Sequence, residues 1–273
     1  GGHSGSEIDK KRANANIVMG RFLYALKQEA DYEIISYEGG QKDNAITREA
    51  ICEILVARED VEAVKASAAK AEEGLREEYA GTDGNITVQI AEEGHTEADV
   101  LHPTSREKVL FYLVQVPFGI QKMSGNIEGL VETSTNIGIV KLSDDEFFAS
   151  SSVRSSVEAA RDALSNKIQY LTEFLGGEYE IQGAYPAWEY RKDSPLRDKM
   201  VSVYEEMYGQ KPEVVAIHAG LECGLFYKKI EGLDCVSLGP NMKGIHTSEE
   251  VLDIASTERV WNYIVKVLEQ LKD

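Results

Sequence analysis

Apolar residues in the first ninety positions switch between two spacings. Over about 10–29, and again over 61–79, they recur at steps of three and four, which predicts two amphipathic helices. Between these helices, 32–37 and 50–57 are short apolar runs, and 86–90 alternates apolar with polar positions. Both patterns are typical of strands. The predicted order is helix, strand, strand, helix, strand.

A similar order returns in the next ninety residues. Thr104 and Glu107 form a capping box, in which each side chain satisfies a free backbone amide at the start of a helix. Strands are predicted over 131–142 and 146–154, and a closing strand over 178–184 follows another amphipathic helix. The order helix, strand, strand, helix, strand therefore occurs twice.

The repeated order is that of the ferredoxin-like β-α-β-β-α-β fold without its first strand. We therefore expect two ferredoxin-like units in tandem, about 1–92 and 97–185. The first strand of the first unit is missing from this sequence, because the sequence begins at its helix.

Residues 186–273 follow a different pattern. Strands predicted over 214–219 and 236–239 alternate with helices, which implies a parallel sheet covered by helices. Two strands cannot form such a sheet alone, so we expect them to join further strands. Thr247 and Glu250 form a second capping box before the last helix. The predicted class is α/β, with an α+β first part and the C-terminal portion of a larger α/β domain after it.

The net charge of the chain limits the classes of molecule that it is expected to bind. The 273 residues carry 47 acidic and 29 basic side chains, which gives a formal net charge of −18. Such a field repels nucleic acid and anionic lipid, so neither is expected as a partner. No apolar run approaches the roughly 18 residues of a membrane span, so a membrane is not expected either. The three cysteines have no metal-ligand spacing and are interpreted as reduced thiols of a cytoplasmic protein.

Five residues in predicted loops and strands are candidates for chemistry. His246 precedes the last predicted helix and is either a metal ligand or an ordinary loop histidine. Gly220 and Glu222 stand at a strand-to-helix turn, where a substrate contact and a simple tight turn are both open. Asn136 and Arg154 lie on paired strands and either hold a carboxylate or form a surface pair. Spacing alone does not separate these alternatives.

Eight short motifs occur in order along the chain: GGHSG at 1–5, RANAN at 12–16, NAI and REA within 44–50, ETSTNIG at 132–138, GAYPAW at 183–188, IHAGLECGLF at 217–226 and SLGP at 237–240. Together they resemble the aminoacyl-histidine, or Xaa-His, dipeptidases. That family belongs to the carnosinase-like superfamily of dinuclear zinc peptidases.

The resemblance implies a two-domain enzyme in which a dimerising lid is inserted into a zinc-binding α/β domain. Residues 1–185 match the lid, and 186–273 match the C-terminal part of the catalytic domain. The chain would then be a fragment that lacks most metal ligands and is inactive alone. The complete enzyme would be a homodimer that cleaves Xaa-His dipeptides with two zinc ions.

Site residues are also implied by the resemblance. His3 matches the lid histidine that steadies the oxyanion, reaching a neighbouring active site in the dimer. Asn136 and Arg154 match the residues that hold the peptide's C-terminal carboxylate, although the surroundings of Arg154 depart from the superfamily pattern. His246 matches the final zinc ligand. Gly220 and Glu222 lie in the motif at 217–226 and are counted with the substrate-binding residues.

Two other functions remain open from the sequence. Tandem ferredoxin-like units also occur in non-catalytic modules that associate or bind ligands. A related amidohydrolase that cleaves N-acyl amino acids would differ from a dipeptidase only in the detail of its pocket.

Overall fold

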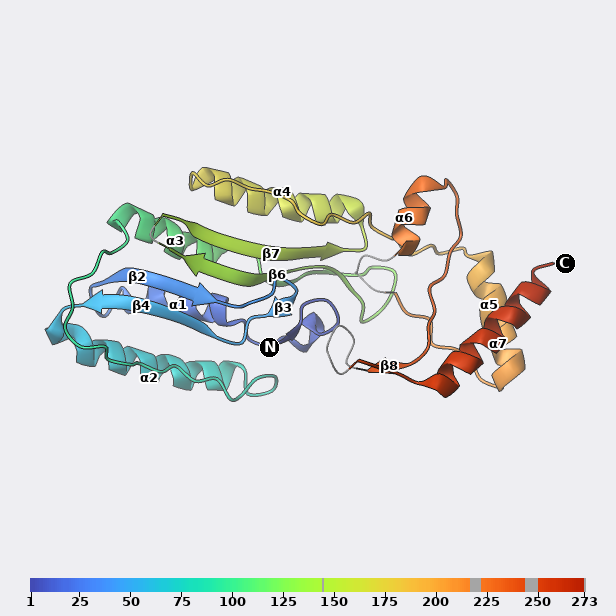
Figure 1. Ribbon diagram of the computed structural model, residues 1–273, viewed down its shortest axis with the longest axis horizontal. Coiled ribbons are helices and arrows are strands. Elements are labelled where there is room, and N and C mark those ends of the chain that lie inside the picture. Colours follow the sequence, from blue (N-terminus) through green and yellow to red (C-terminus); the bar gives the residue numbers. More distant parts are fainter. Residues whose placement is uncertain (144, 217–221, 244–249, 273) are drawn as a thin grey trace. The chain divides into compact units, whose positions relative to one another are not determined.

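The computed structural model describes residues 1–143, 145–216, 222–243 and 250–272 (Figure 1). The described chain divides into two compact units, the first formed by Gly1–Gly183 and the second beginning at Ala184. The predicted mixture of helices and strands is confirmed. Within these residues, no helix combines the length and the apolar character needed to cross a membrane.

The first unit is built on one antiparallel sheet. Its central strand, β6 (Val131–Leu142), is paired along its length with β7 (Phe147–Ser155). On the other edge of β6, β5 (Gly119–Met123) pairs with its first half and β2 (Tyr32–Gly39) with its last three residues. β4 (Ala50–Val56) lies outside β2. A separate two-residue ladder joins β1 (Gly2–His3) to β3 (Ala45–Ile46).

The predicted tandem ferredoxin-like arrangement is not confirmed. The strands of both predicted units share the one sheet, because β2 pairs directly with β6. The closing strands expected at 86–90 and 178–184 are not formed. Instead, the backbone at 86–88 is held by side chains of the preceding helix: Arg76 Nε donates to the Ile86 carbonyl at 2.9 Å, and Glu72 accepts from the Val88 amide at 2.7 Å.

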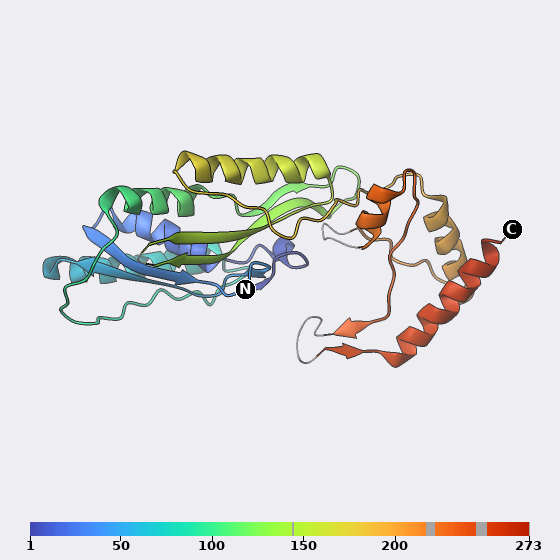
Figure 2. The same ribbon diagram turned by 45° about the horizontal axis from the view of Figure 1, so that its top comes forward.

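Four helices run roughly along the strands of this sheet (Figures 1 and 2). They are α1 (Ala15–Leu26), α2 (Val61–Glu78), α3 (Pro103–Gln115) and α4 (Glu158–Phe174). A short 3₁₀ turn (Ile8–Lys10) precedes α1, and another (Arg58–Asp60) precedes α2. The helix expected over 10–29 is therefore shorter than predicted, and Asn14 caps it.

The start of α3 corrects the predicted capping box. His102, not Thr104, is the N-cap, and its Nδ1 accepts from the Thr104 amide at 3.2 Å. Glu107 does not reach back to the cap but bonds Lys27 at 2.6 Å. Pro103 takes the first helical position, where its missing N–H costs nothing.

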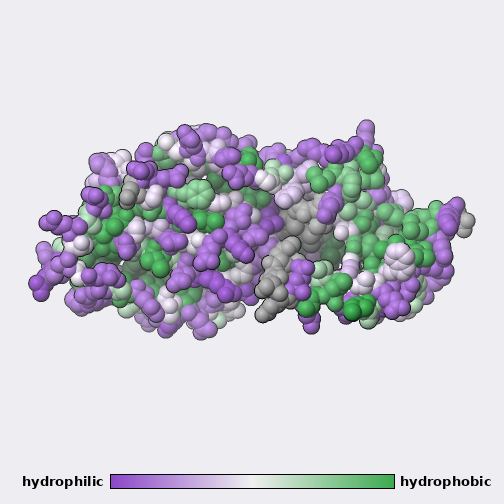
Figure 3. Space-filling view, in the orientation of Figure 1, coloured by the Kyte–Doolittle hydropathy of each residue, from purple (hydrophilic) through white to green (hydrophobic). Residues whose placement is uncertain are grey.

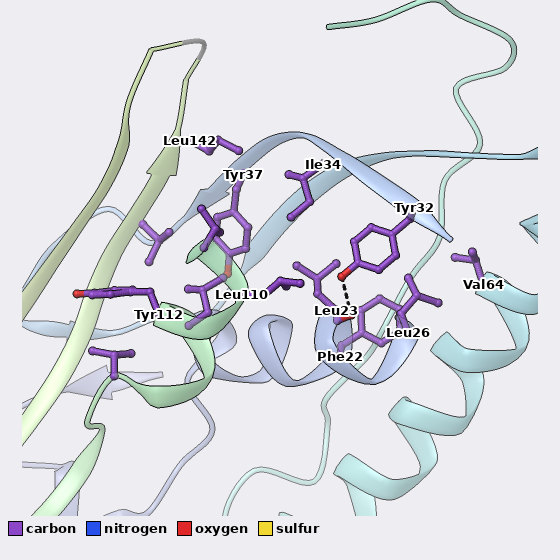
Figure 4. Packing of buried hydrophobic residues seen from close by; sticks show 14 of the residues in the cluster. Phe22, Leu23, Leu26, Tyr32, Ile34, Tyr37, Val64, Leu110, Tyr112 and Leu142 are labelled. Atoms are coloured by element: carbon purple, nitrogen blue, oxygen red, sulfur yellow. Dashed lines mark hydrogen bonds between the residues drawn. The ribbon is translucent and has the colours of Figure 1, made fainter. Parts of the chain in front are cut away.

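The main core lies between α1, α3 and the sheet (Figure 4). Leu23 and Leu26 of α1 meet Ile34 of β2, and the Tyr32 hydroxyl donates to the Leu23 carbonyl at 2.6 Å. β6 and α3 complete the cluster with apolar side chains that are almost wholly buried, namely Val109, Leu110, Leu113, Ile137 and Val140. This packing fixes the position of β6, which carries candidate site residues.

The second unit contains α5 (Pro195–Tyr208), α6 (Glu222–Lys229) and α7 (Ile254–Gln270), with a hairpin of β8 (Met242–Lys243) and β9 (Val251–Leu252). The predicted strands do not form at 214–216 or 236–239, and 217–219 lie outside the described residues. Thr247 of the predicted capping box also lies outside them. Asp253 caps α7, because its Oδ1 accepts from the Ser256 amide at 2.9 Å.

On the face seen in Figure 3, hydrophobic side chains form exposed patches on the second unit among hydrophilic ones. On α7, Ile254 is 83% exposed and Trp261 67% exposed. The opposite face of α7 packs against α5 in a small core made of Met200, Val203, Tyr263 and Val267.

Candidate substrate-binding site

Three of the predicted site residues fall in or beside the second unit. Glu222 is the first residue of α6, where its carboxylate favours the helix dipole. Gly220 and His246 lie outside the described residues. Their predicted roles in substrate and zinc binding therefore stay predictions.

His3 is held in place through its backbone. It lies opposite Ala45 in the β1–β3 ladder, and the next amide, of Ser4, donates to the Asn44 carbonyl at 2.9 Å. The His3 amide itself donates to Glu7 Oε2 at 2.9 Å. We call the segment at 43–46 the His3 support, because it holds the His3 backbone in place.

The ring of His3 is oriented by two backbone donors. Its Nδ1 accepts from the amides of Gly5 and Ser6, each at 3.1 Å. A ring nitrogen that accepts carries no proton, so the neutral imidazole keeps its proton on Nε2. Nε2 is therefore the ring nitrogen that carries the donor proton of this histidine.

Glu7 braces the same turn electrostatically. Its Oε1 accepts from Lys10 at 2.6 Å and from Arg12 at 3.3 Å, while Oε2 accepts from the His3 amide. The hydrogen bond from Lys10, then that from His3, lowers the pKa of Glu7 to about 2. The carboxylate stays ionised, and the turn stays braced, throughout the neutral range.

Arg154 comes from β7, far along the chain, yet lies beside His3. A Cβ added at Gly5 would stand 3.0 Å from His3 Cε1 and 3.4 Å from Arg154 Cζ, so the imidazole and the guanidinium both lie next to this glycine. The sheet therefore brings together a hydrogen-bond donor and a permanent cation that are 151 positions apart in the chain. The family resemblance assigns both residues to the active site, but neither the motifs nor the spacing predicted that the two lie side by side.

Asn136 does not present its amide to a ligand in this structure. The side chain is fully buried, and its Nδ2 donates to the backbone carbonyls of Ala45 at 2.8 Å and Asp43 at 3.1 Å. Its Oδ1 accepts from Asn14 Nδ2 at 3.0 Å. A carboxylate needs a donor, and both donors of this amide are used inside the fold. In this structure the side chain has an internal structural role, and its predicted contact with the substrate stays a prediction.

Sequence reasoning missed the polar cluster around Asn136. Asn14, Asn16 and Thr47 are buried and hydrogen-bonded to one another or to the carbonyls of Ile137 and Gly138. The RANAN and NAI motifs contain or adjoin these residues, but the motifs alone assign them no role. The signal that could have revealed this cluster is the occurrence of uncharged polar side chains next to buried apolar positions.

The described residues do not form a metal centre. Within them, no three His, Cys, Asp or Glu side chains lie close enough together to hold an ion. The donor set of the first unit, one imidazole beside a guanidinium, suits an anionic or carbonyl ligand rather than a cation. The described residues alone therefore do not fit a zinc ion.

One protein-family model matches most of the chain and shows its family. The model described as peptidase family M20/M25/M40 matches residues 15–270. The chain belongs to this family. Peptidases of the M20 family are in general metal-dependent. The resemblance seen in the sequence motifs is thereby confirmed.

Two M20 relatives extend over nearly the whole chain. The cytosol non-specific dipeptidase of Escherichia coli (strain K12) is 32% identical over 271 residues, which are 99% of this chain and 56% of the relative. A crystal structure of the aminoacylhistidine dipeptidase from Vibrio alginolyticus matches 98% of this chain and 55% of its own, with 33% identity and a TM-score of 0.88.

The chain thus spans about half the length of these M20 relatives.

Proposed function

We propose that the protein hydrolyses dipeptides and that its first unit binds the substrate through Arg154 and His3. The observation that carries this proposal is that both side chains lie next to Gly5, each within 3.4 Å of the position that a Cβ on this glycine would take. Support also comes from family membership and from relatives whose names are those of dipeptidases.

Arg154 suits the free carboxylate that every dipeptide carries at its C-terminus. A guanidinium is always charged and can donate two parallel hydrogen bonds to one carboxylate. A longer peptide carries its carboxylate farther from the scissile bond, so an arginine at a fixed position favours short substrates. This contact is made before and during the reaction, and its loss acts mainly on KM.

His3 suits the oxygen of the scissile carbonyl. Its Nε2–H is a donor because Nδ1 is occupied by two backbone amides. The carbonyl oxygen gains negative charge as water adds to it, so a preformed donor helps more in the transition state than before it. Loss of His3 therefore acts on kcat.

The remaining features of the proposal rest on the family resemblance. They are a preference for Xaa-His dipeptides, two zinc ions with His246 among their ligands, a homodimer in which His3 serves the neighbouring site, and a cytoplasmic location. The cytosolic name of the E. coli relative supports the last of these.

The test uses the complete protein encoded by the gene, with a panel of Xaa-His dipeptides, other dipeptides, dipeptide amides and N-acetyl amino acids. We expect His3→Ala to lower kcat by about 10²–10³, the usual loss for one oxyanion donor. Arg154→Ala should raise KM for dipeptides and leave amides unaffected. His95→Ala, which alters an exposed histidine outside the site, is the matched control.

Other results would contradict parts of the proposal. Cleavage of N-acetyl amino acids in preference to dipeptides would favour an amidohydrolase. Absence of hydrolysis across the whole panel, with the dipeptides still bound, would favour a non-catalytic module. Near-normal kcat in His3→Ala would remove the oxyanion role.

A further inference from the structure

One edge of β6 is completed by side chains instead of a strand. β5 pairs with β6 up to Thr135, and β2 pairs with it from Val140 onward. No described strand pairs with this edge at 136–139, and the β6–β7 register also shifts there. Backbone carbonyls in such a gap need other donors, since a buried, unpaired carbonyl is costly.

Buried side chains supply those donors. Asn14 Nδ2 donates to the Ile137 carbonyl at 2.9 Å, and Thr47 Oγ1 donates to the Gly138 carbonyl at 3.0 Å. Asn14 also caps α1, since its Oδ1 accepts from the Asn16 amide at 2.9 Å. The start of α1 is thereby fastened to the gap in β6.

The same cluster continues to the support of His3. Asn14 Nδ2 donates to Asn136 Oδ1, which orients the Asn136 amide so that its own donors face the Asp43 and Ala45 carbonyls. Ala45 lies opposite His3 in the β1–β3 ladder. Hydrogen bonds thus join the helix cap to the backbone at 43–45, and the Asn44 carbonyl in turn accepts from the amide of Ser4, the residue after His3.

Backbone packing makes this path stiff. A Cβ added at Gly138 would lie 2.4 Å from the Asp43 carbonyl oxygen, so the segment at 43–46 rests directly on the β6 backbone. Asn14 and Asn136 are fully buried, which keeps water from replacing their hydrogen bonds.

We infer that the Asn14–Asn136 amide pair is a positioning device for His3, setting where its imidazole stands relative to Arg154. The inference rests on the proposed function, which assigns His3 the oxyanion role. The Nδ2 donors of both asparagines are used inside the fold, so the role we assign to the pair is positioning rather than contact with the substrate. A displacement of about 1 Å at a reacting group can lower the rate as much as 10²-fold. The Asn14–Asn136 pair therefore affects kcat through the position of His3.

The key variant is Asn14→Ser in the complete protein. Serine is a good N-cap, so the start of α1 is kept while the donor to Asn136 is lost. We expect kcat to fall tenfold or more while KM for dipeptides changes less than twofold. Tyr37→Phe is the matched control, because its hydroxyl donates to Asn16 Oδ1 at 3.2 Å in the same buried cluster without touching Asn136 or the His3 support.

A double-mutant cycle with His3→Ala separates positioning from a general loss of stability. If the amide pair acts through His3, Asn14→Ser should lower kcat no further in the His3→Ala background. An equal fall in both backgrounds would overturn the inference.

Hydrogen exchange at the Ser4 amide gives a readout that does not depend on activity. This amide donates to the Asn44 carbonyl, so Asn14→Ser should speed its exchange at least tenfold, and Tyr37→Phe should not. Unchanged Ser4 exchange in Asn14→Ser would overturn the inference. If His3→Ala alone leaves kcat unchanged, the oxyanion role fails. Exchange at the Ser4 amide then decides whether the Asn14–Asn136 pair holds the β1–β3 ladder in place.

Discussion

Gly5 shows how little room the site leaves around its two functional side chains. The space where its Cβ would stand is bounded by the His3 ring and by the Arg154 guanidinium. The Gly5 amide also donates to His3 Nδ1. Gly5 therefore orients the imidazole through its amide, and a side chain at this position would crowd both the imidazole and the guanidinium.

The turn that carries His3 should respond to acid through Glu7. The pKa of Glu7 is lowered from 4.5 to about 2, so its stabilising contacts are fully present above about pH 4.5 and are lost as the pH falls through about 2. The His3 amide resonance, followed by NMR, should shift over that window.

Glu7→Gln is the control for this titration, because its amide oxygen can still accept from the His3 backbone but carries no charge. In this variant the His3 resonance should be flat between pH 4.5 and 2. A shift of equal size in the variant would assign the titration to another group.

The site is predictable where a motif names a residue, and not where a role depends on burial. Motifs identify His3 and Arg154, and the structure brings the two together. From the residues alone, Asn136 either holds a carboxylate or belongs to a surface pair, and the family resemblance favours the carboxylate. The structure buries the Asn136 side chain, and no local spacing reveals that its donors meet carbonyls more than ninety positions away.

At the scale of elements, the start of α5 depends on a cap built from two side chains. Ser194 Oγ accepts from the Arg197 amide at 3.1 Å and donates to Asp234 Oδ1 at 2.7 Å. Asp234 Oδ2 in turn accepts from the Leu196 amide at 2.9 Å. Ser194→Ala should destabilise the second unit by about 1 kcal/mol, the usual loss for an N-cap.

Denaturant unfolding measures this loss, with Ser202→Ala as the comparison, since Ser202 lies on the exposed surface of the same helix. Equal stability of the two variants would show that Asp234 alone caps the helix.

Elements with a regular apolar period are predicted well, and those that depend on distant partners are not. β6 is predicted at 131–142 and has those bounds, since a long alternating run specifies its own conformation. The run at 86–90 alternates too, but it finds side chains of α2 in place of the expected neighbouring strand. Likewise, His102 rather than Thr104 is the cap of α3, with Pro103 at the first helical position.

At the scale of the whole molecule, the two units have separate cores. The main core includes Leu23, whereas the core of the second unit includes Met200, and the two clusters share no residue. Leu23→Ala and Met200→Ala should each cost about 2–5 kcal/mol, because each truncation leaves a cavity.

Hydrogen exchange resolved along the chain should place each of these losses in its own unit. Leu23→Ala should speed exchange in α1, α3 and the sheet while leaving α5 and α7 unchanged, and Met200→Ala should do the reverse. Faster exchange in both units from either substitution would show that the units unfold together.

The stretch between α2 and α3 has a consequence for how the chain could be divided. Residues 91–100 are exposed and have no regular structure, yet the pieces on either side are joined by the β2–β6 pairing, by α1 against α3, and by the Leu101 amide on the Ile34 carbonyl at 2.7 Å. Continuity of the backbone at this stretch contributes little to the fold. A protease that nicks it would leave two halves still clasped through the sheet, and the same two halves made separately would complement one another on mixing.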